Sequence, residues 1–154
     1  MIRAALRSFE LFADFRDWEL DRLRKMMEDL RLPSGRAFIE QGATAGDAEA
    51  RAFIVVAGNV RIVRYDAQGD VVFETQVGPG AFLGVVALVL DHARAATCEA
   101  ATDCRVLAMN RATFDAMFDA DSRLAVKFKQ VVARQLARDL RRANEALAAK
   151  AATS

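Results

Sequence analysis

Between Gly35 and Met109 the sequence is a series of short apolar runs separated by residues typical of turns. The runs are Ala37 to Glu40, Phe53 to Ala57, Val60 to Tyr65, Val71 to Val77, Thr97 to Ala101 and Arg105 to Met109. Turn sequences such as Gly58-Asn59 and Gly78-Pro79-Gly80 separate them at intervals suited to hairpins. Many short strands with regular turns predict an antiparallel β sandwich or barrel. Within it, we expect Arg64 and Glu74 to form an ion pair across neighbouring strands.

Helical patterns flank this β region on both sides. Asp17 stands where a helix N-cap would, before apolar residues at helical spacing, which predicts a helical lead-in that ends before Pro33. Asn110 can cap a second helix that contains Phe114. The small, acidic segment Ala43 to Ala50 is predicted to be an exposed loop. The expected organisation is one domain, 1–154, with the lead-in at 1–32, the β region at 33–109 and C-terminal helices at 110–154.

A third helix is predicted from about Ser122 to Ala149, because apolar residues recur there at spacings of three and four. Such a helix would reach roughly 40 Å, more than a small barrel can cover. We therefore expect part of its apolar stripe to meet a second copy of the chain. The alternative is that the helix packs wholly against its own domain. The candidate dimerisation residues are Phe128, Val132, Leu136, Leu140 and Leu147.

The composition is that of a folded protein with a small net charge. Hydrophobic residues make up 53% of the 154 residues and the formal net charge is +1, so overall charge gives no case for binding nucleic acid or a membrane surface. The basic residues gather after Asp121, where a solvated helix face is the simplest interpretation. The longest apolar run is too short to span a bilayer.

The chain lacks the residues that metal centres and common catalytic sites require. Cys98, Cys104 and the single histidine, His92, cannot assemble a zinc site by the usual spacings. We expect both thiols to be reduced and buried in a cytoplasmic protein. The sequence carries neither a nucleophile with a histidine base nor a Walker-type motif, so we expect no enzymatic activity and no metal.

The segment Gly80 to Thr97 is the strongest functional signal. It places a glycine-bearing turn, a short apolar helix and one arginine, Arg94, in close order. Backbone N–H groups at a helix N-terminus favour negative charge, and a guanidinium can close over the same anion with paired donors. The segment therefore predicts an anion cradle.

Taken together, these features resemble the cyclic nucleotide-binding domain family, which includes catabolite activator-type regulators and regulatory subunits of protein kinase A. The resemblance covers about Leu11 to Leu140. It rests on Phe12, Leu20, Leu23, Gly35, Gln41-Gly42, Phe53-Ile54, Gly58-Asn59-Val60, Gly78-Pro79-Gly80, Phe82, Leu83-Gly84, Ala87-Leu88, Arg94-Ala95-Ala96-Thr97, Val106-Leu107 and Phe114. It implies a mainly β fold with flanking α-helices: an antiparallel β jelly roll (double-stranded β-helix) with N-terminal helices and a long C-terminal helix.

The resemblance also implies a ligand site. Arg94 would hold a phosphate, with Gly84, Val85, Val86, Ala95 and Ala96 lining the cradle, and Ala95 favours cAMP over cGMP. The cassette is degenerate, because Val85 stands where the family has a glutamate that binds the ribose, and Ala93 where proline is common. Loss of a hydrogen bond to a charged group predicts roughly 10- to 150-fold weaker binding.

The resulting hypothesis is a non-catalytic sensor that binds a cyclic nucleotide, cAMP-like and weakly, or another small anion, and that signals through its C-terminal helix as a homodimer. No other cofactor is expected. The alternative is a ligand-free dimerisation or interaction domain that has lost nucleotide binding. Only Lys150 to Ser154 follow the last predicted helix, so sequence-specific DNA binding by this chain is not expected.

Overall fold

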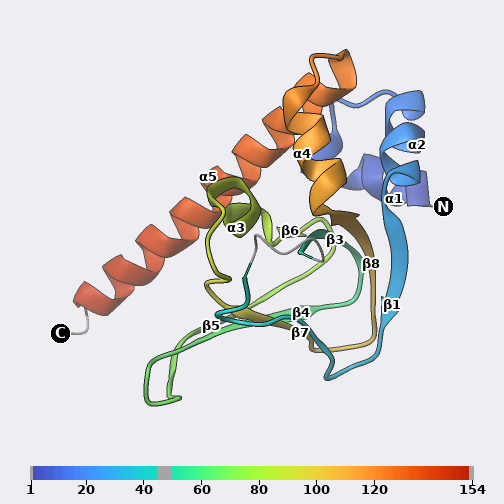
Figure 1. Cartoon of the computed structure of the whole chain (residues 1–154). Coiled ribbons are helices and arrows are strands. Elements are labelled where there is room, and N and C mark those ends of the chain that lie inside the picture. Colours follow the sequence, from blue (N-terminus) through green and yellow to red (C-terminus); the bar gives the residue numbers. More distant parts are fainter. Residues whose placement is uncertain (1, 45–49, 153–154) are drawn as a thin grey trace.

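The computed structural model describes residues 2–44 and 50–152. It begins with helices α1 (Ile2–Ser8), η1 (Glu10–Phe12) and α2 (Asp17–Lys25), which pack above one sheet of the β region (Figure 1). Helix α2 begins at Asp17, one residue earlier than an Asp17 cap would allow, because Arg16 occupies the N-cap. The Arg16 N–H donates to Glu19 Oε1 at 2.8 Å, which satisfies a backbone donor at the helix start.

The strands of the described residues form two four-stranded antiparallel sheets, in the orders β1-β8-β3-β6 and β2-β7-β4-β5. This arrangement confirms the predicted mainly β fold with flanking helices. The strands are β1 (Glu28–Leu32), β2 (Ala37–Ile39), β3 (Arg51–Ala57), β4 (Val60–Tyr65), β5 (Val71–Val77), β6 (Phe82–Leu83), β7 (Thr97–Ala100) and β8 (Cys104–Asn110).

The sheet that contains β3 separates two hydrophobic cores. Ala52 and Ile54 of β3 belong to the core beneath the helices, whereas Phe53 and Val55 belong to the core between the two sheets. Successive side chains of a strand point to opposite faces, so a strand buried on both sides is nearly continuous in apolar residues. The apolar run of β3 therefore reflects its central place between the two cores.

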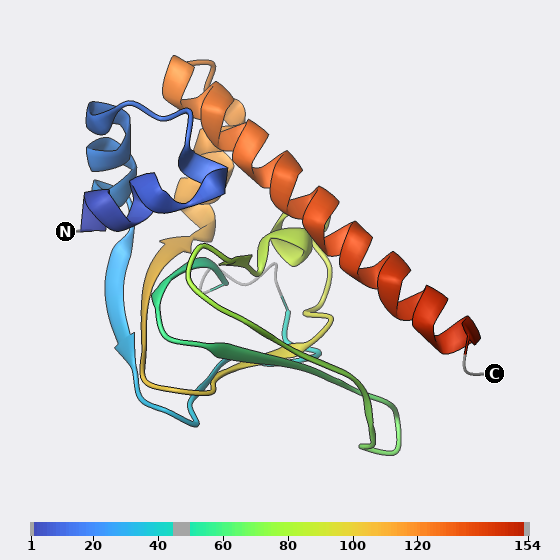
Figure 2. The same ribbon diagram turned by 180° about the vertical axis from the view of Figure 1, so that it is seen from behind.

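The chain ends in helices α4 (Arg111–Asp119) and α5 (Arg123–Ala152). The Asn110 side chain accepts from the Thr113 N–H at 2.8 Å, which confirms the predicted cap. Helix α5 crosses the molecule and then extends away from it (Figure 2). Its first half is anchored by Phe128, whose ring lies 5.7 Å from that of Phe114 and 6.2 Å from that of Phe82.

A second anchor of α5 is a buried ion pair with α2. Lys127 Nζ lies 2.6 Å from Glu19 Oε1, and the Glu19 side chain is fully buried. Burial alone would raise the pKa of Glu19, but hydrogen bonds from Lys127 and from the Arg16 N–H together lower it. Glu19 is therefore held as a carboxylate, which fixes α5 to the N-terminal helices.

Two sequence-based expectations are corrected by the structure. The helical lead-in ends at Lys25, and residues 28–32 form strand β1, because this segment pairs with β8 along its whole length. Glu74 pairs with Arg61 rather than Arg64, since the register places Arg64 opposite Phe73 on the other face of the sheet. Strand β6 was not predicted. Most of the predicted loop Ala43 to Ala50, residues 45–49, lies outside the described residues.

Candidate functional site

The predicted cassette forms a turn and one short helix. Strand β6 leads into Gly84, which has a left-handed backbone (φ +84°) and caps helix α3 (Val85–Leu90). A left-handed φ is accessible to glycine at little cost. A Cβ at this position would come within 2.7 Å of Arg94 Nη1 and 3.0 Å of the Arg51 carbonyl oxygen. Gly84 is therefore required both for the turn and for the close approach of Arg94.

Arg94 lies at the centre of the cassette and is 7% exposed. Its Nη1 donates to the Gly84 carbonyl at 2.8 Å and its Nη2 donates to the Arg51 carbonyl at 2.6 Å. Among the described residues it makes no ion pair with an acid. Burial lowers the pKa of the guanidinium. The cassette thus contains a buried cation whose partners are neutral carbonyl groups.

The backbone of Arg94 is fixed by the segment that follows β2. The Arg94 N–H donates to the Ala43 carbonyl at 2.9 Å, and the Gly42 N–H donates to the Arg94 carbonyl at 2.8 Å. Thr44 and Ala93 form an antiparallel bridge beside them. These contacts extend the pairing of β2 with β7, so the position of Arg94 is set by a sheet rather than by a free loop.

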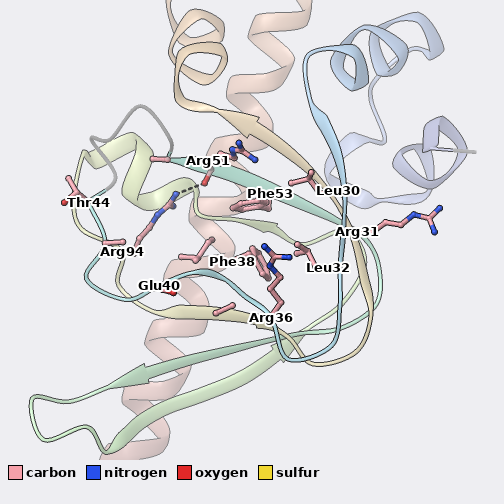
Figure 3. A pocket seen from close by; sticks show the side chains of 14 residues that line it. Leu30, Arg31, Leu32, Arg36, Phe38, Glu40, Thr44, Arg51, Phe53 and Arg94 are labelled. Atoms are coloured by element: carbon pink, nitrogen blue, oxygen red, sulfur yellow. Dashed lines mark hydrogen bonds between the residues drawn. The ribbon is translucent and has the colours of Figure 1, made fainter.

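The Arg94 side chain borders a cavity of about 530 Å³ (Figure 3). The cavity is lined by Leu30, Arg31, Leu32, Arg36, Ala37, Phe38, Ile39, Glu40, Ala43, Thr44, Ala50, Arg51, Phe53 and Arg94. Its wall is formed mainly by β1, β2 and the start of β3. Its volume lies within the range of roughly 300–1,000 Å³ that is usual for small-molecule sites.

Among the predicted ligand-binding residues, Arg94 lines this cavity and the other five do not. Val85 is 1% exposed and belongs to the core beneath the helices, on the opposite side of the sheet from the core that contains Phe53. Val86 and Ala96 are half-buried and Ala95 is exposed. Gly84 contributes its carbonyl to Arg94.

Sequence reasoning missed Arg36, Phe38 and Phe53 as cavity residues. Phe38 and Phe53 lie in predicted strands, but β1, which forms another part of the cavity wall, was expected to be helical up to Pro33. Leu30 and Leu32 alternate with Asp29 and Arg31, a period of two that was available as a strand signal.

The two cysteines and the histidine do not line the cavity. Cys98 and Cys104 are buried free thiols, and burial raises the pKa of Cys98 to about 12. His92 is exposed. In residues 2–44 and 50–152, no group of three or more His, Cys, Asp or Glu side chains is placed to hold a metal ion. None of the helices in these ranges is both long and apolar enough to cross a membrane.

The predicted dimerisation residues divide between two environments. Phe128 and Val132 are 0% and 2% exposed and pack in the chain's own core, so in this conformation they are not accessible to a partner. Leu136 is half-buried, whereas Leu140 and Leu147 are 63% and 66% exposed. Of the five predicted residues, Leu140 and Leu147 are therefore the ones exposed to a partner in this conformation.

Comparisons with known proteins agree with this architecture. A family model described as "Cyclic nucleotide-binding domain" matches residues 30–121, more than half of the chain. A "cAMP-dependent protein kinase regulatory subunit" from Aspergillus fumigatus is 29% identical over 114 residues, which are 74% of this chain and 26% of that protein. The chain thus spans about a quarter of the length of this relative.

Solved structures show the same fold. A cyclic nucleotide-binding domain from Methylobacillus flagellatus superposes with a TM-score of 0.81 at 18% identity, covering 97% of this chain and 82% of that one. The catabolite activator protein of Thermus thermophilus gives a TM-score of 0.71 at 26% identity, covering 92% of this chain and 62% of that one. With its paired sheets, its glycine-helix-arginine cassette and the match over residues 30–121, this chain belongs to the cyclic nucleotide-binding domain family.

Proposed function

We propose that this domain is a non-catalytic sensor that binds a small anion, with a cyclic nucleotide as the first candidate, at Arg94 and that transmits binding to helix α5. The observation that carries the proposal is the Arg94 guanidinium, which is buried against Gly84 of the cassette and has no acidic partner in the part of the chain that the structure describes. A buried charge without a counter-charge is costly, so this site favours a ligand that supplies one.

The chemistry of Arg94 suits a phosphate or carboxylate. Its present partners are carbonyl oxygens of Gly84 and Arg51, which carry partial charge only. A phosphate could accept paired hydrogen bonds with full charge, and such bonds are about twice as strong as neutral ones. The name of the Aspergillus relative, a cAMP-dependent kinase regulatory subunit, supports a cyclic nucleotide among the candidate anions.

Val85 argues for weak nucleotide binding. Its side chain is buried beneath the helices and offers no acceptor to a ribose hydroxyl. We therefore expect cAMP to bind at least tenfold more weakly than a site with the family glutamate. The small, exposed Ala95 favours cAMP over cGMP, as the family resemblance implies.

A short path of contacts would carry the signal from the cassette to α5. Phe82, two residues before Gly84, accepts an edge-to-face contact from the Phe128 ring, and its N–H donates to Gln135 Oε1 at 3.4 Å. Both Phe128 and Gln135 belong to α5. An anion that draws Arg94 away from the Gly84 carbonyl would shift β6 and thereby bias the position of α5.

Isothermal titration calorimetry with cAMP, cGMP and cyclic dinucleotides tests this proposal. We expect cAMP to bind the wild-type chain in the micromolar to millimolar range and to lose binding in Arg94→Ala. The matched control is Arg64→Ala, since Arg64 is an exposed arginine of β4 that does not line the cavity. If no cyclic nucleotide binds even at millimolar concentration, the nucleotide part of the proposal is wrong.

A second candidate function is a ligand-free interaction domain that dimerises through the second half of α5. It is favoured by the complete burial of Val85, which leaves that position no role in a ligand site. The candidate contact residues are Leu136, Leu140 and Leu147. A cytoplasmic location stays a prediction under both functions.

A further inference from the structure

The cavity beside Arg94 lies at one edge of the molecule. Strand β1 is an edge strand of one sheet and β2 an edge strand of the other, and both contribute to its wall. No residue of β4, β5 or α5 lines it. In Figure 3 helix α5 passes behind the sheets, away from this cavity. A ligand held here would therefore lie between the edge strands and Arg94, without touching α5.

The wall between the edges is apolar and aromatic. Leu30, Leu32, Phe38 and Phe53 line it, and the rings of Phe38 and Phe53 meet edge to face with their centroids 4.9 Å apart. Phe38 is only half-buried, which leaves part of its ring facing the cavity. Such a surface favours a flat apolar body, because aromatic contacts add to the free energy of burial.

Among the described residues that line the cavity, positive charges outnumber negative ones. Arg51 is compensated by Glu28 at 3.2 Å, and Arg31 extends away from the cavity. Arg36 extends from the start of β2 towards the Phe38 ring and makes no ion pair within the described residues (Figure 3). With the buried Arg94, the cavity thus has, within residues 2–44 and 50–152, two guanidiniums without an acidic partner and one lining carboxylate, the exposed Glu40.

We infer that this cavity binds a small organic anion with a flat apolar body, such as an aromatic acid. One acidic group pairs with Arg94, the body lies against Phe38 and Phe53, and a second acidic group pairs with Arg36. The inference rests on the proposed function for its anchor, Arg94, and narrows the ligand class. Among the described lining residues a ribose would find few side-chain acceptors, since those with oxygen are Glu40 and Thr44.

The test uses terephthalate, a flat dicarboxylate, with benzoate as the monoacid and benzamide as the neutral analogue. Binding is followed by calorimetry and by amide chemical shifts of ¹⁵N-labelled protein. We expect terephthalate to bind with a dissociation constant on the order of a millimolar, as its size allows. Benzoate should bind more weakly and benzamide not measurably. The shifted amides should be those of residues 30–40 and 51–53.

Four variants and one control separate the contributions of Arg94, Phe38 and Arg36 to binding. Arg94→Ala should weaken terephthalate binding roughly 10- to 150-fold, as expected for a lost hydrogen bond to a charged group. Arg94→Lys, which keeps the charge, guards against loss through misfolding and should bind better than the alanine variant. Phe38→Ala should weaken both acids, and Arg36→Ala should remove the preference for terephthalate over benzoate. Arg64→Ala, an exposed arginine of β4 that does not line the cavity, is the matched control and should bind as the wild type does.

The outcomes distinguish this inference from the proposed function. Equal binding of benzamide and terephthalate, or equal affinities of Arg36→Ala, Phe38→Ala and Arg64→Ala, would overturn the inference. If cAMP then still binds through Arg94, the proposed function stands without it. If terephthalate binds as expected and cyclic nucleotides do not, the sensor takes aromatic acids rather than nucleotides. Absence of binding by both probes overturns both.

Discussion

Arg94 and Gly84 are interlocked: the guanidinium Nη1 lies 2.8 Å from the Gly84 carbonyl oxygen, in space that a Cβ on Gly84 would enter to within 2.7 Å. Neither residue can be replaced without disturbing the other. The cassette therefore depends on a pair of positions ten residues apart, and this pairing has a direct consequence for stability.

Gly84→Ala should destabilise the fold more than Gly69→Ala does. Both glycines have φ +84°, so both variants incur the cost of a left-handed backbone, about 1 kcal/mol or more. At Gly69 nothing lies within 4 Å of a Cβ, so the excess at Gly84 measures the clashes with Arg94 Nη1 and the Arg51 carbonyl oxygen. Thermal or urea unfolding measures the loss of stability in both variants. In Gly84→Ala/Arg94→Ala the two effects should be non-additive; simple additivity would contradict the interlock.

Val85→Glu should lower the free energy of unfolding by about 3–5 kcal/mol, because a carboxylate would be buried without a partner. The control is Val89→Glu on the same helix, where the side chain is 37% exposed and the expected change is small. Thermal melts of both variants, with and without cAMP, measure the change in stability. A stable Val85→Glu protein that binds cAMP tightly would contradict the ligand-free interaction domain and favour the sensor.

Glu19→Gln should destabilise the protein by roughly 2–3 kcal/mol at pH 7, because Lys127 would lose its charged partner. The pKa of Glu19 is lowered in the folded state, so its contribution is complete above its unfolded pKa of about 4.3. It is lost as the pH falls through the lower, folded pKa. Urea unfolding of both proteins from pH 7 to pH 3 should show their difference shrink. Asp14→Asn, which breaks the exposed pair with Arg134, should change little throughout.

Two substitutions in α5 should have opposite effects on assembly and stability. Leu140→Glu should convert a dimer to a monomer in analytical ultracentrifugation and leave the melting temperature of the domain nearly unchanged, because Leu140 is exposed in one chain. Phe128→Ala should lower the free energy of unfolding by about 3–5 kcal/mol. A wild-type monomer at tens of micromolar would exclude dimerisation through α5.

Cys98 should be unreactive in the folded protein. Burial raises its pKa to about 12, so the thiol stays protonated at pH 8. A thiol-specific disulfide reagent should therefore modify Cys98 at pH 8 only after denaturant is added, since the thiolate is the reactive form. Rapid modification of the native protein would indicate that β7 opens.

The sequence predicted the architecture because most of its elements carry their own local signals. Strands β3, β4, β5 and β8 are apolar runs bounded by turns, and Asn110 caps α4 as expected. Strand β1 was missed because its residues also fit a helix, and only pairing with β8 decides between the two. Strand β6 has two residues and no periodicity to detect.

The site was predicted in part for a related reason. Arg94 and Gly84 stand out in the sequence by type and order, and the structure places them in contact. The core that a residue joins depends on the fold. Val85 therefore could not be assigned to the core beneath the helices from the sequence alone. Arg36 and Phe38 were missed because they lie just before and in β2, which is far from the cassette in sequence and meets it only through the fold.

The second half of α5 extends away from the core, with Leu140 and Leu147 exposed. Its last buried residue is Gln135, which also accepts from the Phe82 N–H beside the cassette. From there to Ala152 the helix extends about 25 Å at 1.5 Å per residue. A tilt of about 10° at Gln135 would therefore swing the far end by roughly 4–5 Å, given that rise. A movement at the cassette too small to disturb the core would be magnified at the tip of the helix.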